Sequence, residues 1–232
     1  MPQQQNRAGQ TIRQLALRRR VKSIASFTIA GLFTLSPFFL IKNVGPLLGR
    51  LTSNNSLAQL FSYALPIVYG GFLIASLFLI VCGIRFWEMA NRADQGARGE
   101  EITSRELSIL KGEGWIFEYG MRLGNGLGDA DILCVSPREK AYVVDVKSHR
   151  GEVMTDGQML SRRMGRTSYP FEKDFIAQTM KQALQVRKQE GFSFVTPILS
   201  FSEAKVEIPG NRIRNVYVVE RADLVSLLRS LG

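Results

Sequence analysis

Three residues in one stretch of the chain, Asp131, Asp145 and Lys147, have types and spacing that suit metal-dependent hydrolysis of a phosphodiester bond. Asp145 and Lys147 are two positions apart in an apolar, β-branched segment, so both point to the same face of a predicted strand. A second apolar segment precedes this one across a short turn, which is typical of a β-hairpin. If Val135 pairs with Ala141, Asp131 lies directly opposite Asp145 and on its face.

Two facing carboxylates repel each other and tend to share a proton unless a cation neutralises them. Because Mg²⁺ prefers carboxylate oxygens, Asp131 and Asp145 form a candidate site for Mg²⁺ or Mn²⁺. An ion held there polarises a phosphodiester and lowers the pKa of a bound water, while Lys147 orients that water or stabilises charge on the phosphate. The alternative is an ordinary solvated strand face. The position of both acids inside apolar strands argues against this alternative.

A predicted helix upstream of the hairpin offers a third carboxylate. The helix is expected to begin with Asp94 as its N-cap. Its predicted apolar arc consists of Ile102, Leu107, Ile109 and Leu110. Glu100 lies at the margin of this arc, where its carboxylate can reach a site at the edge of the core. Glu106 lies inside the arc and is the rival candidate for the third carboxylate. Alternatively, Glu100 is an ordinary first-turn acid that the helix dipole favours.

Taken together, three short segments resemble the nuclease-related domain (NERD) family, which is placed in the PD-(D/E)XK nuclease superfamily. The resemblance covers about residues 94–232, and its specificity lies in the order and spacing of the segments. They are Gly96-Ala97-Arg98-Gly99-Glu100, Gly128-Asp129-Ala130-Asp131 and Val144-Asp145-Val146-Lys147-Ser148.

This resemblance implies a role for each candidate residue. Glu100 would be the acid carried by the helix, Asp131 and Asp145 the two strand acids, and Lys147 the catalytic lysine. The metal ligands would be the three carboxylates. The family often has a catalytic glutamine on a later helix. Gln182 is the candidate for this role, and Gln178 is equally available.

The C-terminal part of the chain has the pattern of a small α/β domain. Further predicted elements are a helix over residues 175–188, strands over 194–201 and 216–219, and a closing helix over 222–231. Strands separated by helices favour a mixed sheet covered on both faces. We therefore expect a restriction-endonuclease-like mixed sheet flanked by helices.

The first third of the chain predicts a transmembrane helical hairpin. Residues 23–41 and 51–84 contain no charged side chain, and each run is long enough to cross a bilayer, which needs about 20 apolar residues. Core helices of a soluble domain and a cleaved signal peptide are the alternatives. The uniformly apolar composition argues against the first, and the absence of a small-residue cleavage site after Ile41 argues against the second. The predicted organisation is a basic tail (1–22), two spans with a short loop (23–86) and a nuclease-like domain (87–232).

The charge distribution predicts the topology of that hairpin. Eight of the 30 Lys and Arg residues precede residue 85, where there is no acid, and this leaves 22 basic against 20 acidic residues in the rest of the chain. Positive residues flank spans on the cytoplasmic side, so the tail and the C-terminal domain should be cytoplasmic and the loop exterior. The net charge of +10 is therefore mainly a topology signal. Candidate phosphate contacts, which an ordinary solvated surface would also explain, are His149, Arg150, Arg162, Arg163 and Arg166.

Few other chemistries fit the sequence. The single histidine excludes a multi-histidine metal site, and Cys82 and Cys134 lie in a predicted span and a predicted strand, which indicates neither a disulfide nor a zinc site. We therefore expect a membrane-anchored nuclease that acts on DNA or RNA with Mg²⁺ or Mn²⁺. The alternative is a non-catalytic nucleic-acid-binding or membrane scaffold module that retains the nuclease fold.

Overall fold

The computed structural model describes residues 8–51 and 55–232. These form two compact units, of which one combines the chain up to Arg13 with Ala93–Gly232 and the other is Gln14–Arg92. Parts of two predicted segments, residues 1–7 of the basic tail and 52–54 of the exterior loop, lie outside the described residues.

Two long helices, α1 (Gln10–Leu51) and α2 (Asn55–Lys111), pair in the unit Gln14–Arg92. The Ser23 hydroxyl donates to the Gly83 carbonyl at 2.7 Å, and a Cβ at Gly83 would lie 2.7 Å from the Phe27 ring. Small residues at such contacts let two helix backbones approach closely, as in membrane helix pairs. By length and composition, two segments could cross a membrane, namely Gln10–Asn43 and Tyr63–Lys111.

The predicted helix start at Asp94 is wrong, because α2 begins at Asn55 and continues through Asp94 to Lys111. The segment before Asp94 contains no Pro and is rich in good helix formers such as Glu88, Met89 and Ala90, so nothing interrupts the helix there.

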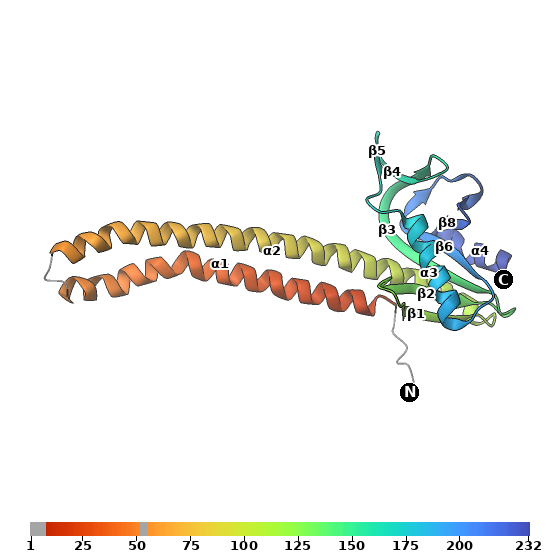
Figure 1. Cartoon of the computed structure of the whole chain (residues 1–232), viewed down its shortest axis with the longest axis horizontal. Coiled ribbons are helices and arrows are strands. Elements are labelled where there is room, and N and C mark those ends of the chain that lie inside the picture. The colour runs from red at the N-terminus through yellow and green to blue at the C-terminus, as the bar shows by residue number, and fades with distance from the viewer. Residues whose placement is uncertain (1–7, 52–54) are drawn as a thin grey trace, which may run out of the picture. The chain divides into compact units, whose positions relative to one another are not determined.

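An eight-stranded mixed sheet is the centre of the other unit (Figure 1). The order β1-β2-β3-β6-β8-β7 runs across it, while β4 and β5 extend from β3. Pairing is antiparallel at β1–β2 and β2–β3 and parallel at β3–β6 and β6–β8. The strands are β1 (Ile116–Arg122), β2 (Asp129–Val135), β3 (Ala141–Thr155), β4 (Leu160–Met164), β5 (Thr167–Pro170), β6 (Val195–Val206), β7 (Arg212–Ile213) and β8 (Val216–Glu220), with a short 3₁₀ helix η1 (Pro209–Asn211).

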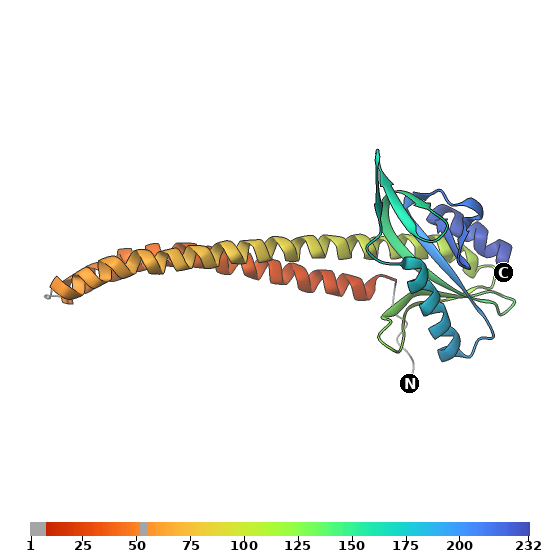
Figure 2. The same ribbon diagram turned by 45° about the horizontal axis from the view of Figure 1, so that its top comes forward.

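Helices cover both faces of this sheet, which confirms the predicted mixed sheet flanked by helices. Helix α3 (Phe175–Glu190) crosses one face (Figure 2) and packs on residues such as Val143 and Leu199. The last turns of α2 and helix α4 (Arg221–Leu231) pack on the other face, against residues such as Val144. Both predicted C-terminal helices and both predicted C-terminal strands are confirmed, although β6 is longer than expected.

The buried line of α2 differs in one place from the predicted arc. Glu100, Thr103, Leu107 and Leu110 are buried and follow one another at spacings of three or four residues. Ile109 lies off this line and is 61% exposed, so its prediction as a core residue is wrong. Glu100 therefore continues the apolar line and reaches the core of the unit.

The ends of α3 are fixed by caps. The Asp174 side chain accepts a hydrogen bond from the Ala177 N–H at 2.9 Å, and Gly191 ends the helix in the left-handed conformation. The buried face of this helix includes two polar residues, Thr179 and Gln182. Both come from the face of α3 that packs on the sheet.

Candidate active site

The β2–β3 hairpin has the predicted register. Val135 pairs with Ala141 and Ile132 with Val144, after which the pairing of the backbones stops. The next position places Asp131 opposite Asp145. Here a side chain replaces the backbone as the hydrogen-bond acceptor between the strands, because Asp131 Oδ2 accepts a hydrogen bond from the Val146 N–H at 2.7 Å.

Asp145 forms a buried ion pair at the centre of the site. It is 1% exposed, and its Oδ1 accepts from Lys147 Nζ at 2.7 Å. The Thr179 hydroxyl lies 3.3 Å from the other oxygen, Oδ2, and 2.8 Å from the Phe175 carbonyl oxygen. Lys147 Nζ also lies 5.2 Å from the centre of the Phe175 ring, so the residues from α3 hold both members of the pair.

Glu100 reaches this pair from α2 because a glycine precedes it. A Cβ at Gly99 would lie 2.1 Å from Ser148 Oγ on β3 and 2.7 Å from Ser202 Oγ on β6. Any larger residue would require both serine hydroxyls to move, so glycine favours this close approach of the helix backbone to the two strands. This approach brings Glu100, which is 7% exposed, within electrostatic range of Asp145 and Lys147.

The electrostatics of the cluster reflect burial and like charge. Burial raises the pKa of Glu100 to about 7, with a further rise from Asp145, while the Gly9 N–H and Lys147 oppose the shift. Burial and then the charges of Asp145 and Glu100 raise the pKa of Asp131 well above its ordinary value. Burial lowers the pKa of Lys147, but the neighbouring carboxylates outweigh it and raise that pKa overall. A single lysine therefore faces three acids.

The shift at Glu100 predicts a pH dependence of stability. In metal-free protein, folding raises the pKa of Glu100 from 4.5 to about 7, so deprotonation in this window favours the unfolded state. The Tm of the wild type should fall relative to Glu100→Gln as the pH rises from 5 to 7, and the difference should change little above that. The exposed-turn variant Glu139→Gln should instead follow the wild type. Parallel curves for Glu100→Gln and the wild type would contradict the buried, destabilised carboxylate.

The two glutamine candidates differ in position. Gln182 is buried, and its Nε2 donates to the Asp129 carbonyl at the start of β2 at 3.2 Å, whereas Gln178 is only half-buried. Within the described chain, Gln182 Oε1 is buried and has no hydrogen-bond partner. Gln182 is thus the glutamine that the fold brings to the strand bearing Asp131.

Thr179 also belongs to the cluster, and the sequence pattern did not predict it as a site residue. It lies three residues before Gln182 on the buried face of α3. A polar residue within an otherwise apolar helix face was the available signal.

The rival acid, Glu106, lies elsewhere. Its carboxylate forms an ion pair with Arg221 at the start of α4, at 3.1 Å. The structure therefore brings Glu100, and not Glu106, to the two strand acids.

The predicted phosphate contacts follow the long strand β3 and the adjoining β4. The His149 ring packs among Phe171, Phe175 and Phe201, and burial and nearby Arg162 lower its pKa. Arg150 is exposed and pairs with Glu203 at 2.6 Å.

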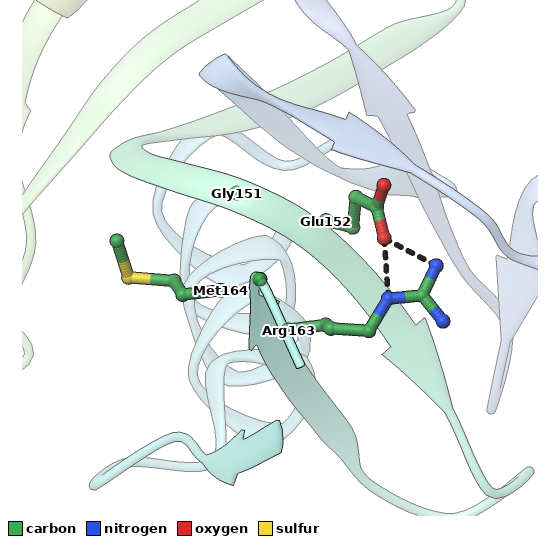
Figure 3. Close-up of a pocket in the computed structure, with 5 residues that line it drawn as sticks. Gly151, Glu152, Arg163 and Met164 are labelled. Carbon is green, nitrogen blue, oxygen red and sulfur yellow. Dashed lines mark hydrogen bonds and ion pairs between the residues drawn. The ribbon is translucent and has the colours of Figure 1, made fainter. Parts of the chain in front are cut away.

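Arg163 is also held by an acid. It pairs with Glu152 across the β3–β4 hairpin, beside a surface pocket that Gly151, Met164 and Gly165 complete (Figure 3). This pocket contains none of the predicted catalytic residues. Arg166 is exposed at the β4–β5 turn, and within the described ranges neither it nor Arg162 forms an ion pair.

The donor set fits a hard divalent ion in its chemistry. Glu100, Asp131 and Asp145 supply carboxylate oxygens. Burial, and after it the like charge of the neighbouring acids, raises the pKa of Glu100 and Asp131, and a bound cation would offset both effects. Across residues 8–51 and 55–232, no three His, Cys, Asp or Glu side chains converge closely enough to form a complete metal site. A bound ion would therefore require the carboxylates to draw together.

The family model of the nuclease-related domain matches residues 95–202, a range that includes Glu100, Asp131, Asp145 and Lys147. Searches of curated proteins and of solved structures each found no significant match. Residues 95–202 are therefore similar to the nuclease-related domain (NERD) family.

Proposed function

We propose that the cluster of Glu100, Asp131, Asp145 and Lys147 hydrolyses phosphodiester bonds of DNA or RNA with Mg²⁺ or Mn²⁺. The observation that carries this proposal is the buried Asp145–Lys147 pair, which faces two further carboxylates with raised pKa values. Perturbed, clustered titratable groups of this kind are typical of functional sites. Their occurrence inside a nuclease-related domain favours nuclease chemistry over a purely structural ion pair.

Each residue has a role that its contacts support. Glu100, Asp131 and Asp145 would hold the ion, which would polarise the phosphodiester and lower the pKa of a bound water. Lys147, freed from part of its pairing with Asp145, would stabilise negative charge that develops on the phosphate. Gln182 holds the start of β2 through the Asp129 carbonyl, and so helps to place Asp131.

Nucleic acid would approach along β3 and β4. We assign phosphate contacts to His149, Arg150, Arg162, Arg163 and Arg166. Arg162 and Arg166 have no ion pair among the described residues, whereas Arg150 and Arg163 must share their charge with Glu203 and Glu152. Binding through such contacts should weaken steeply with salt.

The test is a cleavage assay on the full chain in detergent. Labelled single- and double-stranded DNA and RNA are incubated with Mg²⁺ or Mn²⁺, with and without chelator. Cleavage that requires the metal supports a nuclease. The alternative, a non-catalytic nucleic-acid-binding or membrane scaffold, is favoured by the absence of a converged metal site among the described residues. It would bind nucleic acid with or without chelator and leave every substrate intact.

We further propose that both long helices cross the cell membrane, with the N-terminal tail and the C-terminal domain in the cytoplasm. The two long apolar helices and the basic residues before residue 85 support this placement. A topology reporter fused at Asn54, which lies outside the described residues, should report the exterior, and one fused after Gly232 the cytoplasm. An exterior signal from the C-terminal fusion would overturn the proposed topology.

A further inference from the structure

We infer that the segment Ala8–Arg13 completes the candidate active site, because the backbone N–H of Gly9 positions the carboxylate of Glu100. This inference rests on the proposed function, in which Glu100 is a metal ligand. It makes the start of the chain, outside the matched range 95–202, part of the catalytic apparatus.

The contact is direct and buried. The Gly9 N–H donates to Glu100 Oε2 at 3.0 Å, and 91 positions separate the two residues in the chain. The hydrogen bond engages one oxygen of the carboxylate, Oε2, and so fixes the orientation of the group. Hydrogen bonds that orient a metal-ligating carboxylate are a general feature of metal sites.

Only glycine suits the position of residue 9. Its φ of +72° is in the left-handed region, and a Cβ would lie 2.8 Å from the Ala97 carbonyl oxygen and 3.2 Å from Ala97 Cα. Ala97 lies three residues before Glu100 on α2, which is the adjacent position on the same face of the helix. Gly9 therefore packs directly against the turn of α2 that carries Glu100.

A second contact holds the same segment in place. Arg13 pairs with Glu101 at 2.6 Å, and the Arg13 N–H donates to the Gly9 carbonyl at 2.9 Å in the first turn of α1. The segment is thus tied to α2 at Glu101 as well as at Glu100. Glu101 therefore has a structural partner in Arg13.

The test uses the full chain in detergent, with Mn²⁺ alone as the probe and cleavage as the second readout. Gly9→Ala adds a Cβ that must displace the segment from α2. Gly210→Ala is the matched control, because Gly210 has a φ of +66° but no atom within 4 Å of the added Cβ. Both variants therefore carry the same backbone strain, and only the first disturbs the contact.

Gly9→Ala should lower Mn²⁺ affinity roughly 10- to 100-fold, the range for loss of a group that orients a ligand, and cleavage should fall with it. Gly210→Ala should match the wild type. In a Glu100→Gln background, Gly9→Ala should cause no further loss of affinity, because the group that it positions is no longer a ligand. Arg13→Ala, which loosens the segment without strain at Gly9, should give a smaller loss in the same direction.

Unchanged Mn²⁺ affinity in Gly9→Ala, or an equal loss with and without Glu100→Gln, would overturn the inference. Faster cleavage by Gly9→Ala would also overturn it, since the segment would then block the site. A wild-type chain that binds Mn²⁺ but cleaves no nucleic acid would defeat the proposed function and leave the affinity comparison valid. A wild-type chain that binds no Mn²⁺ would defeat both.

Discussion

Asp145→Asn should lower the rate of metal-dependent cleavage by roughly 10²- to 10³-fold, the range seen when one preorganised charged or polar group is removed from a transition-state site. Asp145 is the most buried acid of the cluster and the one that contacts both Lys147 and Thr179. The amide keeps the shape of the side chain but removes the charge that would bind the ion. Because Lys147 keeps Asp131 and Glu100 as counter-charges after this change, the loss should fall mainly on chemistry rather than on folding.

A matched control for this change is Asp223→Asn. Asp223 is an exposed acid in the first turn of α4, outside the matched range 95–202. This variant should cleave at the wild-type rate. Cleavage by Asp145→Asn within a few fold of the control would show that the assignment of the metal ligands is wrong.

Lys147→Ala should lower turnover to an extent similar to that of Asp145→Asn, while the affinity for the metal is retained. In the proposed mechanism the side chain would neutralise charge near the reacting phosphate and would not ligate the ion, so its loss should lower kcat with little change in the Kd for Mn²⁺. Without metal, the same change leaves Asp145 buried without its cation and should destabilise the fold by about 3–5 kcal/mol. Saturating Mn²⁺ should restore much of this stability, because it supplies the missing charge.

The control here is Lys205→Ala. Lys205 is an exposed lysine on β6 whose pair with Glu207 is 3.3 Å long and solvated, so its loss should change neither kcat nor stability appreciably. A parallel loss of Mn²⁺ affinity and turnover in Lys147→Ala would place the lysine among the groups that build the metal site. Unchanged turnover would remove it from the mechanism.

The hairpin was the most predictable part of the site, because its geometry depends on local rules. The period of two fixes the shared face of Asp145 and Lys147, and the short turn fixes the Val135–Ala141 pairing that sets Asp131 opposite Asp145. The choice of Gln182 over Gln178 was also within reach. Gln182 lies on the face shared by the buried residues of α3, and Gln178 does not.

The missed features depend on contacts between distant segments. Nothing near Gly9 in the sequence indicates that its N–H meets Glu100, and the role of Gly99 becomes visible only when α2 lies against Ser148 and Ser202. The false helix start at Asp94 has a different cause. A capping residue is a signal only where the preceding chain leaves the helix, and here the long apolar helix continues through it.

The most direct test of the account is a Mn²⁺-bound crystal structure of the full chain, with the ion located by its anomalous scattering. One strong peak should be bonded directly to carboxylate oxygens of Asp145 and of at least one of Asp131 and Glu100. The same crystals of Asp145→Asn should lack this peak. A peak at any other set of residues, or no peak in wild-type crystals at saturating Mn²⁺, would contradict the assignment of these carboxylates as a nuclease metal site.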